Sequence, residues 1–262
     1  MSILPNPLAI KQNGIIGYMH LETELWTGTD AEQSFKDNLA KNPSHPDLLH
    51  YKDSPIEYKR NMWGHRSVDV AKITATAKPY ILVTGDSFTE GVGLHQHETY
   101  GELLSKKTGL PVYNLGLAGT GIDIMLHNLM MWKNHVRPAP KILVVQWSYL
   151  SRTCQLHPGN ALLGAVHPAT GDQNINKFLD GGLESGLFET RAILADRLIQ
   201  EFYKSSEIVN VHIPSWESEV YGQQKRIIWN PERDYTPDFA RDLQHTGRAS
   251  HEGLANRILK LF

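Results

Sequence analysis

The sequence predicts a three-layer α/β/α sandwich, in which helices cover both faces of a parallel sheet of about five strands. The length of 262 residues suits one large α/β domain. The hydrophobic share of 40% and the charged share of 21% are ordinary for a globular chain. From about residue 78 onward, short apolar runs alternate with segments of helical length, which is the pattern of repeated βα units. We expect a single domain over residues 1–262, with 1–77 as an irregular lead-in wrapped on it.

The first βα units follow this lead-in. An apolar run at 80–84 predicts a strand, and a helix is expected over 99–107 with Gly109 as its stop. A second strand is expected at 111–115. A second helix is expected over 122–134, because its apolar residues recur on one face: Ile122, Met125, Leu126 and Leu129.

The later units begin with the continuous apolar run 141–146, as expected of a strand that is covered on both faces. Residues 151–189 are rich in Gly, Pro, Asn and His, and they predict an inserted loop region over the crevice. Structureless segments of this length are usually functional or mobile. The remaining elements are expected to be a helix at 190–204, strands at 208–213 and 226–229, and a closing helix at 250–261.

The first strand ends abruptly in Gly85-Asp86-Ser87, which is the most informative feature of the chain. Open α/β sheets keep their ligand crevice at the carboxyl ends of the strands, so Ser87 is a candidate nucleophile there. A serine hydroxyl needs a base, and Asp242 and His245 stand near the C-terminus. Residues three apart in one helical turn or tight loop approach within about 5–6 Å at Cβ. A Ser-His-Asp triad for acyl transfer is therefore the leading hypothesis.

Four short blocks resemble the SGNH hydrolases, also called GDSL esterases. Residues 85–89 (GDSFT) resemble the nucleophile block, and 114–119 (NLGLAG) resemble the second block. Residues 242–245 (DLQH) resemble the final D-x-x-H block, and 61–66 (NMWGHR) are similar to the N-x-x-G-x-R lead-in of some members. The resemblance covers about Asn61 to the C-terminus. It implies the flavodoxin-like fold of that family and a metal-independent serine esterase that works through an acyl-enzyme, without a cofactor.

The resemblance also implies a role for each residue of the site. Ser87 would be the nucleophile, His245 the base that takes its proton, and Asp242 the group that orients His245. The backbone N–H groups of Ser87 and Gly119 would form the oxyanion hole. Fixed donors of this kind contribute roughly 10²–10³ in rate each.

The third block departs from the family pattern. The family carries G-x-N-D after the third strand, and the Asn side chain donates to the oxyanion. Here that strand continues as Gln146-Trp147-Ser148-Tyr149, with no Asn. Ser148 stands roughly where the Asn would be, and Gln146 offers an amide nearby, so either could substitute. Trp147 and Tyr149 are candidates to line the substrate pocket.

Other candidate sites have simpler interpretations. His251 is a rival base, but a helical histidine is the preferred interpretation. His95 and His97 form a close pair without an H-E-x-x-H motif, so we predict no metal site. Residues 116–121 have the spacing G-x-x-G-x-G, which is not the dinucleotide fingerprint, and no cofactor is expected.

The composition indicates which binding partners and which cellular location to expect for the protein. The formal net charge of −2 gives no reason to expect nucleic acid or an anionic membrane surface. No apolar run approaches the roughly 20 residues that span a bilayer, and no signal peptide is visible at the start. Cys154 is the only cysteine, which excludes an intrachain disulfide. A cytosolic setting fits these features, although a mature secreted form would look the same. No pattern indicates an oligomeric state.

The expected substrate is a small-molecule or glycan ester, with a short acyl group such as acetyl on a carbohydrate. Two other functions use the same fold. One is acyl transfer to a sugar hydroxyl in place of water. The other is a non-catalytic glycan-binding module, which the missing third-block Asn motivates.

Overall fold

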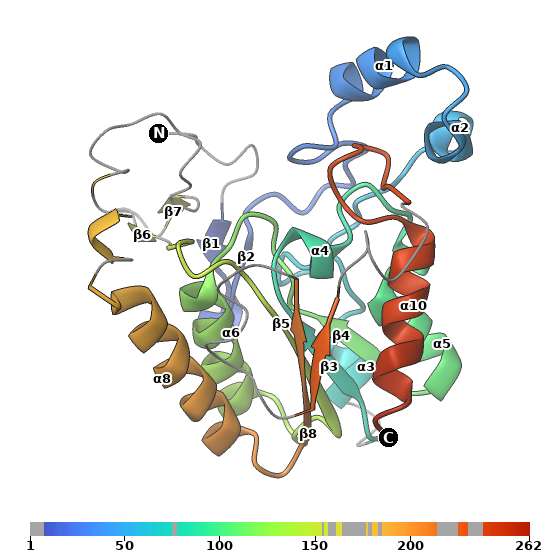
Figure 1. The fold of residues 1–262 in the computed structure, drawn as a ribbon. Coiled ribbons are helices and arrows are strands. Elements are labelled where there is room, and N and C mark those ends of the chain that lie inside the picture. Colours follow the sequence, from blue (N-terminus) through green and yellow to red (C-terminus); the bar gives the residue numbers. More distant parts are fainter. Residues whose placement is uncertain are drawn as a thin grey trace.

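A five-stranded parallel sheet forms the centre of the computed structural model (Figure 1). Its strands lie in the order β4-β3-β5-β8-β9, and every neighbouring pair is parallel. Numbered along the chain, this is the order 2-1-3-4-5 of flavodoxin-like sheets. The strands are β3 (Ile81–Thr84), β4 (Val112–Asn114), β5 (Ile142–Trp147), β8 (Glu207–His212) and β9 (Arg226–Ile228). The structure describes residues 8–74, 78–153, 155–156, 161–163, 177, 180–182, 185–213, 225–229 and 238–262.

The sheet is apolar on both faces, as a parallel sheet between two helical layers must be. β3, β4 and β5 are buried along their whole length. Alternate residues of β3 and β5 face opposite layers: Leu82 and Leu143 belong to one core cluster, Val83 and Val144 to the other. The five predicted strands are confirmed with small shifts of their ends.

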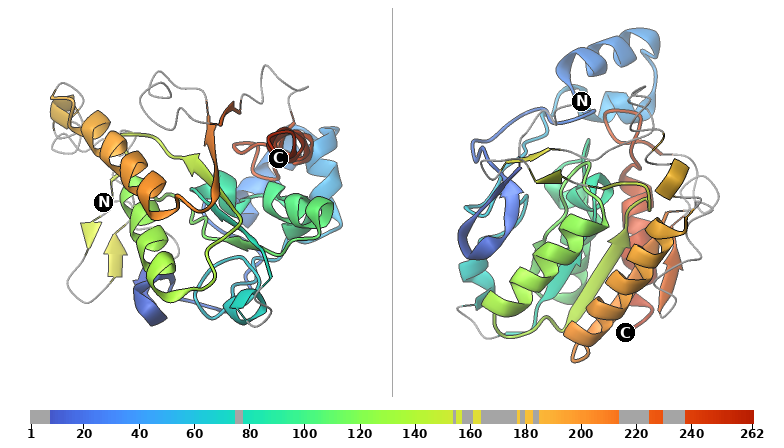
Figure 2. Two further views of the ribbon diagram at one scale, coloured as in Figure 1. Left: turned by 90° about the horizontal axis from the view of Figure 1, so that it is seen from below. Right: turned by 90° about the vertical axis from the view of Figure 1, so that its left-hand side faces the viewer.

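Two pairs of helices cover the sheet (Figure 2). α5 (Tyr100–Thr108) and α10 (Arg248–Leu259) lie side by side on one face. α6 (Ile122–His135) and α8 (Leu187–Phe202) lie side by side on the other. α5 ends at Gly109, whose φ of 70° is left-handed, so the predicted helix stop is confirmed. The three-layer α/β/α sandwich is thus the observed architecture.

The lead-in is less irregular than the sequence predicted. It contains β1 (Leu8–Ile10), β2 (Ile16–Tyr18) and several short helices, and β1 also pairs with a strand from the predicted insertion. These antiparallel strands form a second, small sheet in the order β2-β1-β7-β6. Strands this short leave too little alternation to recognise in the sequence. The elements not yet given are η1 (Gln12–Gly14), α1 (Glu32–Lys41), α2 (Pro46–Lys52), α3 (Val70–Thr74), α4 (Ser87–Glu90), η2 (Gln96–Glu98), β6 (Gln155–Leu156) and β7 (Ala161–Leu163).

The N-x-x-G-x-R segment attaches the lead-in to the loop that follows α4. Gly64 adopts φ 77°, and a Cβ there would lie 2.5 Å from the backbone nitrogen of Tyr18. The buried Arg66 guanidinium donates to the carbonyl oxygens of Gly91 and Leu94, both at 2.7 Å. This motif therefore anchors the segment that follows α4. Figure 1 places α1 and α2 on the side of the sheet where the carboxyl ends of the strands lie.

Within the described residues, no helix is both long and apolar enough to cross a lipid bilayer.

Asn128 on α6 holds the lead-in through two buried hydrogen bonds. Its side chain accepts from the Ile16 N–H at 2.8 Å and donates to the Ile16 carbonyl at 2.9 Å. We expect Asn128→Ala to lower the free energy of unfolding by roughly 2–4 kcal/mol, because two buried backbone groups lose their partners. Urea unfolding measures this as a lower midpoint with an unchanged m value. Asn134→Ala, at an exposed position of the same helix, is the matched control. Equal midpoints for the two variants would contradict this account.

Candidate active site

Ser87 is the first residue of the short helix α4, directly beyond the carboxyl end of β3. Asp86 caps this helix, because its carboxylate accepts the Phe88 N–H at 3.1 Å. Gly85 is required by close packing, since a Cβ there would lie 2.1 Å from the hydroxyl of Thr89. Each member of the Gly-Asp-Ser sequence thus has a physical role in placing the Ser87 hydroxyl.

The structure brings Ser87, His245 and Asp242 together. His245 Nε2 lies 2.8 Å from Ser87 Oγ, and His245 Nδ1 lies 2.6 Å from Asp242 Oδ2. The Asp242–His245 segment is a tight turn rather than a helix, with Leu243 at a φ of 56°. Asp242 Oδ1 accepts the backbone N–H groups of both Gln244 and His245 at 3.0 Å. These bonds fix the imidazole relative to the carboxylate.

Asp242 is fully buried and well supplied with donors. Thr29 Oγ1, from the lead-in, donates to Asp242 Oδ2 at 2.6 Å. Burial on its own would raise the pKa of Asp242, but hydrogen bonds from His245 and Thr29 outweigh it and lower that pKa. The carboxylate is therefore ionised at neutral pH. Nothing in the sequence around Thr29 indicated this contact, which spans 213 positions of the chain.

Two cavity-lining residues, Ser87 and Gly119, have backbone N–H groups without an acceptor among the described residues. The first is free because the opening N–H groups of a helix have no intrahelical partner. The second sits in a loop residue with φ 75°, a conformation that favours glycine. Both residues line one cavity of about 570 Å³, together with His245. Free donors beside a nucleophile can hold the oxygen of a tetrahedral intermediate.

The two side chains proposed as substitutes for the third-block Asn are engaged elsewhere. Gln146 is completely buried, accepts from the Asp86 N–H at 3.2 Å and donates to the Trp147 carbonyl at 2.8 Å. Ser148 Oγ lies 3.0 Å from the Thr120 carbonyl and 3.1 Å from Asp86 Oδ2. Neither residue lines the cavity. The structure therefore gives no support to Ser148 or Gln146 as the missing donor.

The two aromatic residues predicted to line a pocket have different positions. Trp147 is buried in the core, where its indole N–H donates to Asn210 Oδ1 at 2.9 Å, and it does not line the cavity. That prediction is wrong, because β5 extends through Trp147 and is covered on both faces. Tyr149 follows the strand, is 38% exposed and lines the cavity.

Arg152 also lines the cavity, and sequence reasoning missed it. Its Nη1 lies 2.6 Å from Asp86 Oδ2, and its guanidinium carbon lies 5.0 Å from the ring centroid of Tyr149. The residue falls in the predicted insertion 151–189, where no motif was visible. No sequence signal connects it with Asp86, 66 positions earlier.

His251, the rival base, has a structural position. Its Nδ1 accepts the Tyr100 N–H at 3.0 Å, and its ring lies against that of Trp229 at a centroid distance of 5.0 Å. Burial lowers the pKa of His251 to about 3, so the ring is neutral at physiological pH. The histidine in contact with the Ser87 hydroxyl is His245.

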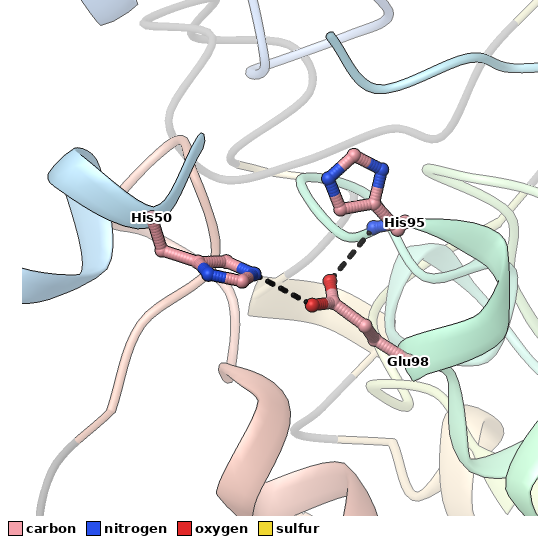
Figure 3. A group of neighbouring side chains, drawn as sticks. All are labelled: His50, His95 and Glu98. Carbon is pink, nitrogen blue, oxygen red and sulfur yellow. Dashed lines mark hydrogen bonds and ion pairs between the residues drawn. The ribbon is translucent and has the colours of Figure 1, made fainter. Parts of the chain in front are cut away.

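Of the histidine pair at 95 and 97, His95 belongs to a cluster with His50 and Glu98 (Figure 3). Potential ligand atoms of His50, His95 and Glu98 lie within 4.8 Å of one another. Both Glu98 oxygens already accept hydrogen bonds: Oε1 lies 2.8 Å from His50 Nε2, and Oε2 lies 3.0 Å from the His95 N–H. Arg248 Nε adds a positive charge 4.0 Å from Oε1. A metal ion would have to displace these contacts. We therefore interpret the cluster as a set of structural contacts that joins α2 to η2.

Comparison with known proteins shows similarity in fold and not in sequence. No protein-family model matches the chain, and no curated protein matches it. Among solved structures, a carbohydrate esterase family 2 enzyme from Corynascus thermopiles (Myceliophthora fergusii) is 14% identical, with a TM-score of 0.44 over 70% of this chain. An acetyl xylan esterase from Butyrivibrio proteoclasticus is 12% identical, with a TM-score of 0.43 over 70% of this chain. A G-D-S-L family lipolytic protein from Veillonella parvula is 14% identical, with a TM-score of 0.46 over 71% of this chain. The matched region covers 65%, 63% and 98% of these proteins.

The buried His251 predicts how stability depends on pH. The native ring stays neutral down to about pH 3, whereas the unfolded ring takes a proton near its ordinary pKa of about 6.5. Between these values the unfolded state binds more protons, so the free energy of unfolding falls as the pH falls. One such histidine contributes a slope of up to about 1.4 kcal/mol per pH unit.

We therefore expect His251→Gln to have a shallower acid limb than the wild-type protein, because glutamine does not titrate. Urea unfolding at several pH values between 4.5 and 7.5 measures both slopes. The difference between the two proteins at the upper end of that range gives the change in the free energy of unfolding that the substitution causes apart from titration. Identical slopes for the two proteins would contradict the assignment of a buried neutral ring.

Proposed function

We propose that this chain is a serine esterase of the SGNH type, which hydrolyses carboxylic esters through an acyl-enzyme. The observation that carries the proposal is the hydrogen-bonded path from Asp242 through His245 to Ser87 Oγ. The serine end of this path lies on a cavity wall, and the carboxylate end is buried. A nucleophile, a base and an orienting acid in this geometry are what acyl transfer requires.

The proposed acylation step uses each residue once. Ser87 Oγ attacks the carbonyl carbon of the ester, and its proton passes to His245 Nε2. Asp242 stabilises the imidazolium that forms, without taking the proton itself. The imidazolium then gives the proton to the oxygen of the leaving alcohol, and the C–O bond breaks to leave an acyl-Ser87 ester. A water activated by His245 reverses these steps and releases the acid.

The free N–H groups of Ser87 and Gly119 support an oxyanion hole. The carbonyl oxygen becomes negative as the tetrahedral intermediate forms, and donors that are already in place stabilise that charge without reorganising. The neighbouring Ala118 N–H is held by Glu90 Oε2 at 2.7 Å, which fixes the loop that carries Gly119.

The substrate class is proposed from the cavity. Its lining residues include Phe88, Val92 and Tyr149. These surfaces suit a short acyl group, such as acetyl, with the alcohol part toward the exposed Tyr149 ring, whose apolar face and polar hydroxyl suit a carbohydrate. Transfer of the acyl group to a sugar hydroxyl is the second candidate, because the same triad serves both reactions.

Replacing the nucleophile tests the proposal. We expect the wild-type protein to hydrolyse a short-chain aryl ester such as p-nitrophenyl acetate, and Ser87→Ala to lose at least about 10⁴ of kcat. Asp242→Asn should lose roughly 10⁴ as well, because the imidazole would then take the wrong tautomer. Ser54→Ala, at an exposed serine, is the matched control. Equal rates for wild type and Ser87→Ala would rule out the esterase.

Labelling and product analysis separate the other functions. A fluorophosphonate probe should modify the wild-type protein at Ser87 and leave Ser87→Ala unlabelled. Saccharide binding without any labelling would indicate a non-catalytic binding module. Products formed with and without a glycan acceptor distinguish transfer from hydrolysis.

A further inference from the structure

We propose that Arg152 is a third donor to the oxyanion, in addition to the backbone N–H groups of Ser87 and Gly119. The proposal rests on the esterase function above and deepens it, since it assigns a catalytic role to a residue outside the triad. Arg152 is the only permanent cation among the described residues that line the cavity. Its position, its free donors and its charge balance each support this role.

The guanidinium is fixed on the wall of the cavity that Ser87 also lines. Nη1 lies 2.6 Å from Asp86 Oδ2 and 3.3 Å from Ser148 Oγ, and the group rests over the Tyr149 ring. Asp86 immediately precedes Ser87, so an arginine bound to its carboxylate stands beside the start of α4. The Arg152 side chain is only 13% exposed. Such a group has little freedom to lose when a substrate binds.

The backbone of Arg152 is fixed from the other side. Its carbonyl accepts from Arg191 Nη2 of α8 at 3.1 Å, and Arg191 also pairs with Asp123 of α6 at 3.3 Å. Gly121, just before α6, leaves room for this turn, because a Cβ there would lie 2.3 Å from the Arg152 carbonyl oxygen. Contacts with α8 and with the turn before α6 therefore fix the backbone from which the guanidinium extends.

Part of the guanidinium is free to serve the substrate. Its two contacts, with Asp86 and Ser148, both involve Nη1. The Nε–H and Nη2–H groups donate to no acceptor in the described part of the chain. A guanidinium carries five N–H donors in a planar fork, so these groups can donate into the cavity while Nη1 stays paired.

The charge balance favours the oxyanion over a permanent anion as the acceptor. Asp86 is 1% exposed and neutralises Arg152, so the pair attracts a distant, fully charged group only weakly. Fixed N–H groups still donate to an oxygen whose charge appears during the reaction. The interaction would then be stronger in the transition state than in the bound ester, which is the condition for raising kcat.

The test measures kcat and KM separately on a neutral short-chain ester. For Arg152→Ala we expect kcat to fall about 100- to 1,000-fold with KM changed by no more than about twofold. For Arg152→Lys, which keeps a cation beside Asp86 but loses the fork, we expect an intermediate loss of kcat. Millimolar guanidinium chloride should restore part of the activity of Arg152→Ala only, which a purely structural role would not produce. Lys72→Met removes an exposed positive charge on α3 and is the matched control.

The outcomes separate this inference from the proposed function. If wild type is active, Ser87→Ala is inactive and both Arg152 variants keep kcat within about twofold, the esterase stands and the role of Arg152 is overturned. That role is also overturned if the variants lose only the binding of esters with an anionic acyl group, seen as a raised KM. If wild type is no faster than Ser87→Ala, the esterase itself fails. Where Arg152→Ala does not fold, Arg152→Lys decides, because its ion pair with Asp86 persists.

Discussion

Buried carboxylates that need partners determine how the candidate site is assembled. A carboxylate removed from water is costly unless cations or hydrogen-bond donors pair with it. Asp86 is 1% exposed, and it is paired with the Phe88 N–H, the Ser148 hydroxyl and the Arg152 guanidinium. Because Asp86 directly precedes Ser87, the groups that pair with its carboxylate lie near the start of α4. One carboxylate therefore caps α4 with Oδ1 and, through Oδ2, holds a cation on the cavity wall.

The same constraint acts on the opposite side of the site. Asp30 and Arg241 are both buried, and two hydrogen bonds of 2.8 and 2.6 Å join them. Arg241 immediately precedes Asp242, and Asp30 immediately follows Thr29, which donates to Asp242. The lead-in thus supplies a counter-charge to Arg241 and a donor to Asp242 from more than 200 positions away. It forms a wall of the site and is not merely an extension of the domain.

These pairings explain what could be predicted from the sequence. Strands covered on both faces appear directly as apolar runs in the sequence, and a glycine marks the end of α5. The main sheet and its helices can therefore be predicted from the sequence. The position of Ser87 followed from its place at the end of β3. The roles of Thr29, Asp30 and Arg152 cannot be predicted from the sequence. Their partners are far away in the chain, and a single polar or charged residue produces no periodic pattern. The short strands β1 and β2 were missed because three residues cannot display an alternation.

The two late histidines show why the environment, and not the residue type, decides a role. His251 lies in an apolar layer with Tyr100 and Trp229, and its one acceptor nitrogen is occupied by a backbone N–H. Burial without a counter-charge keeps that ring neutral, so its role is structural: it packs and accepts one hydrogen bond. His245 has Asp242 on one nitrogen and Ser87 on the other, and it is partly open to the cavity. A ring that must gain and lose a proton needs both a carboxylate to stabilise its charged form and access to the reacting oxygen, and of these two histidines only His245 has them.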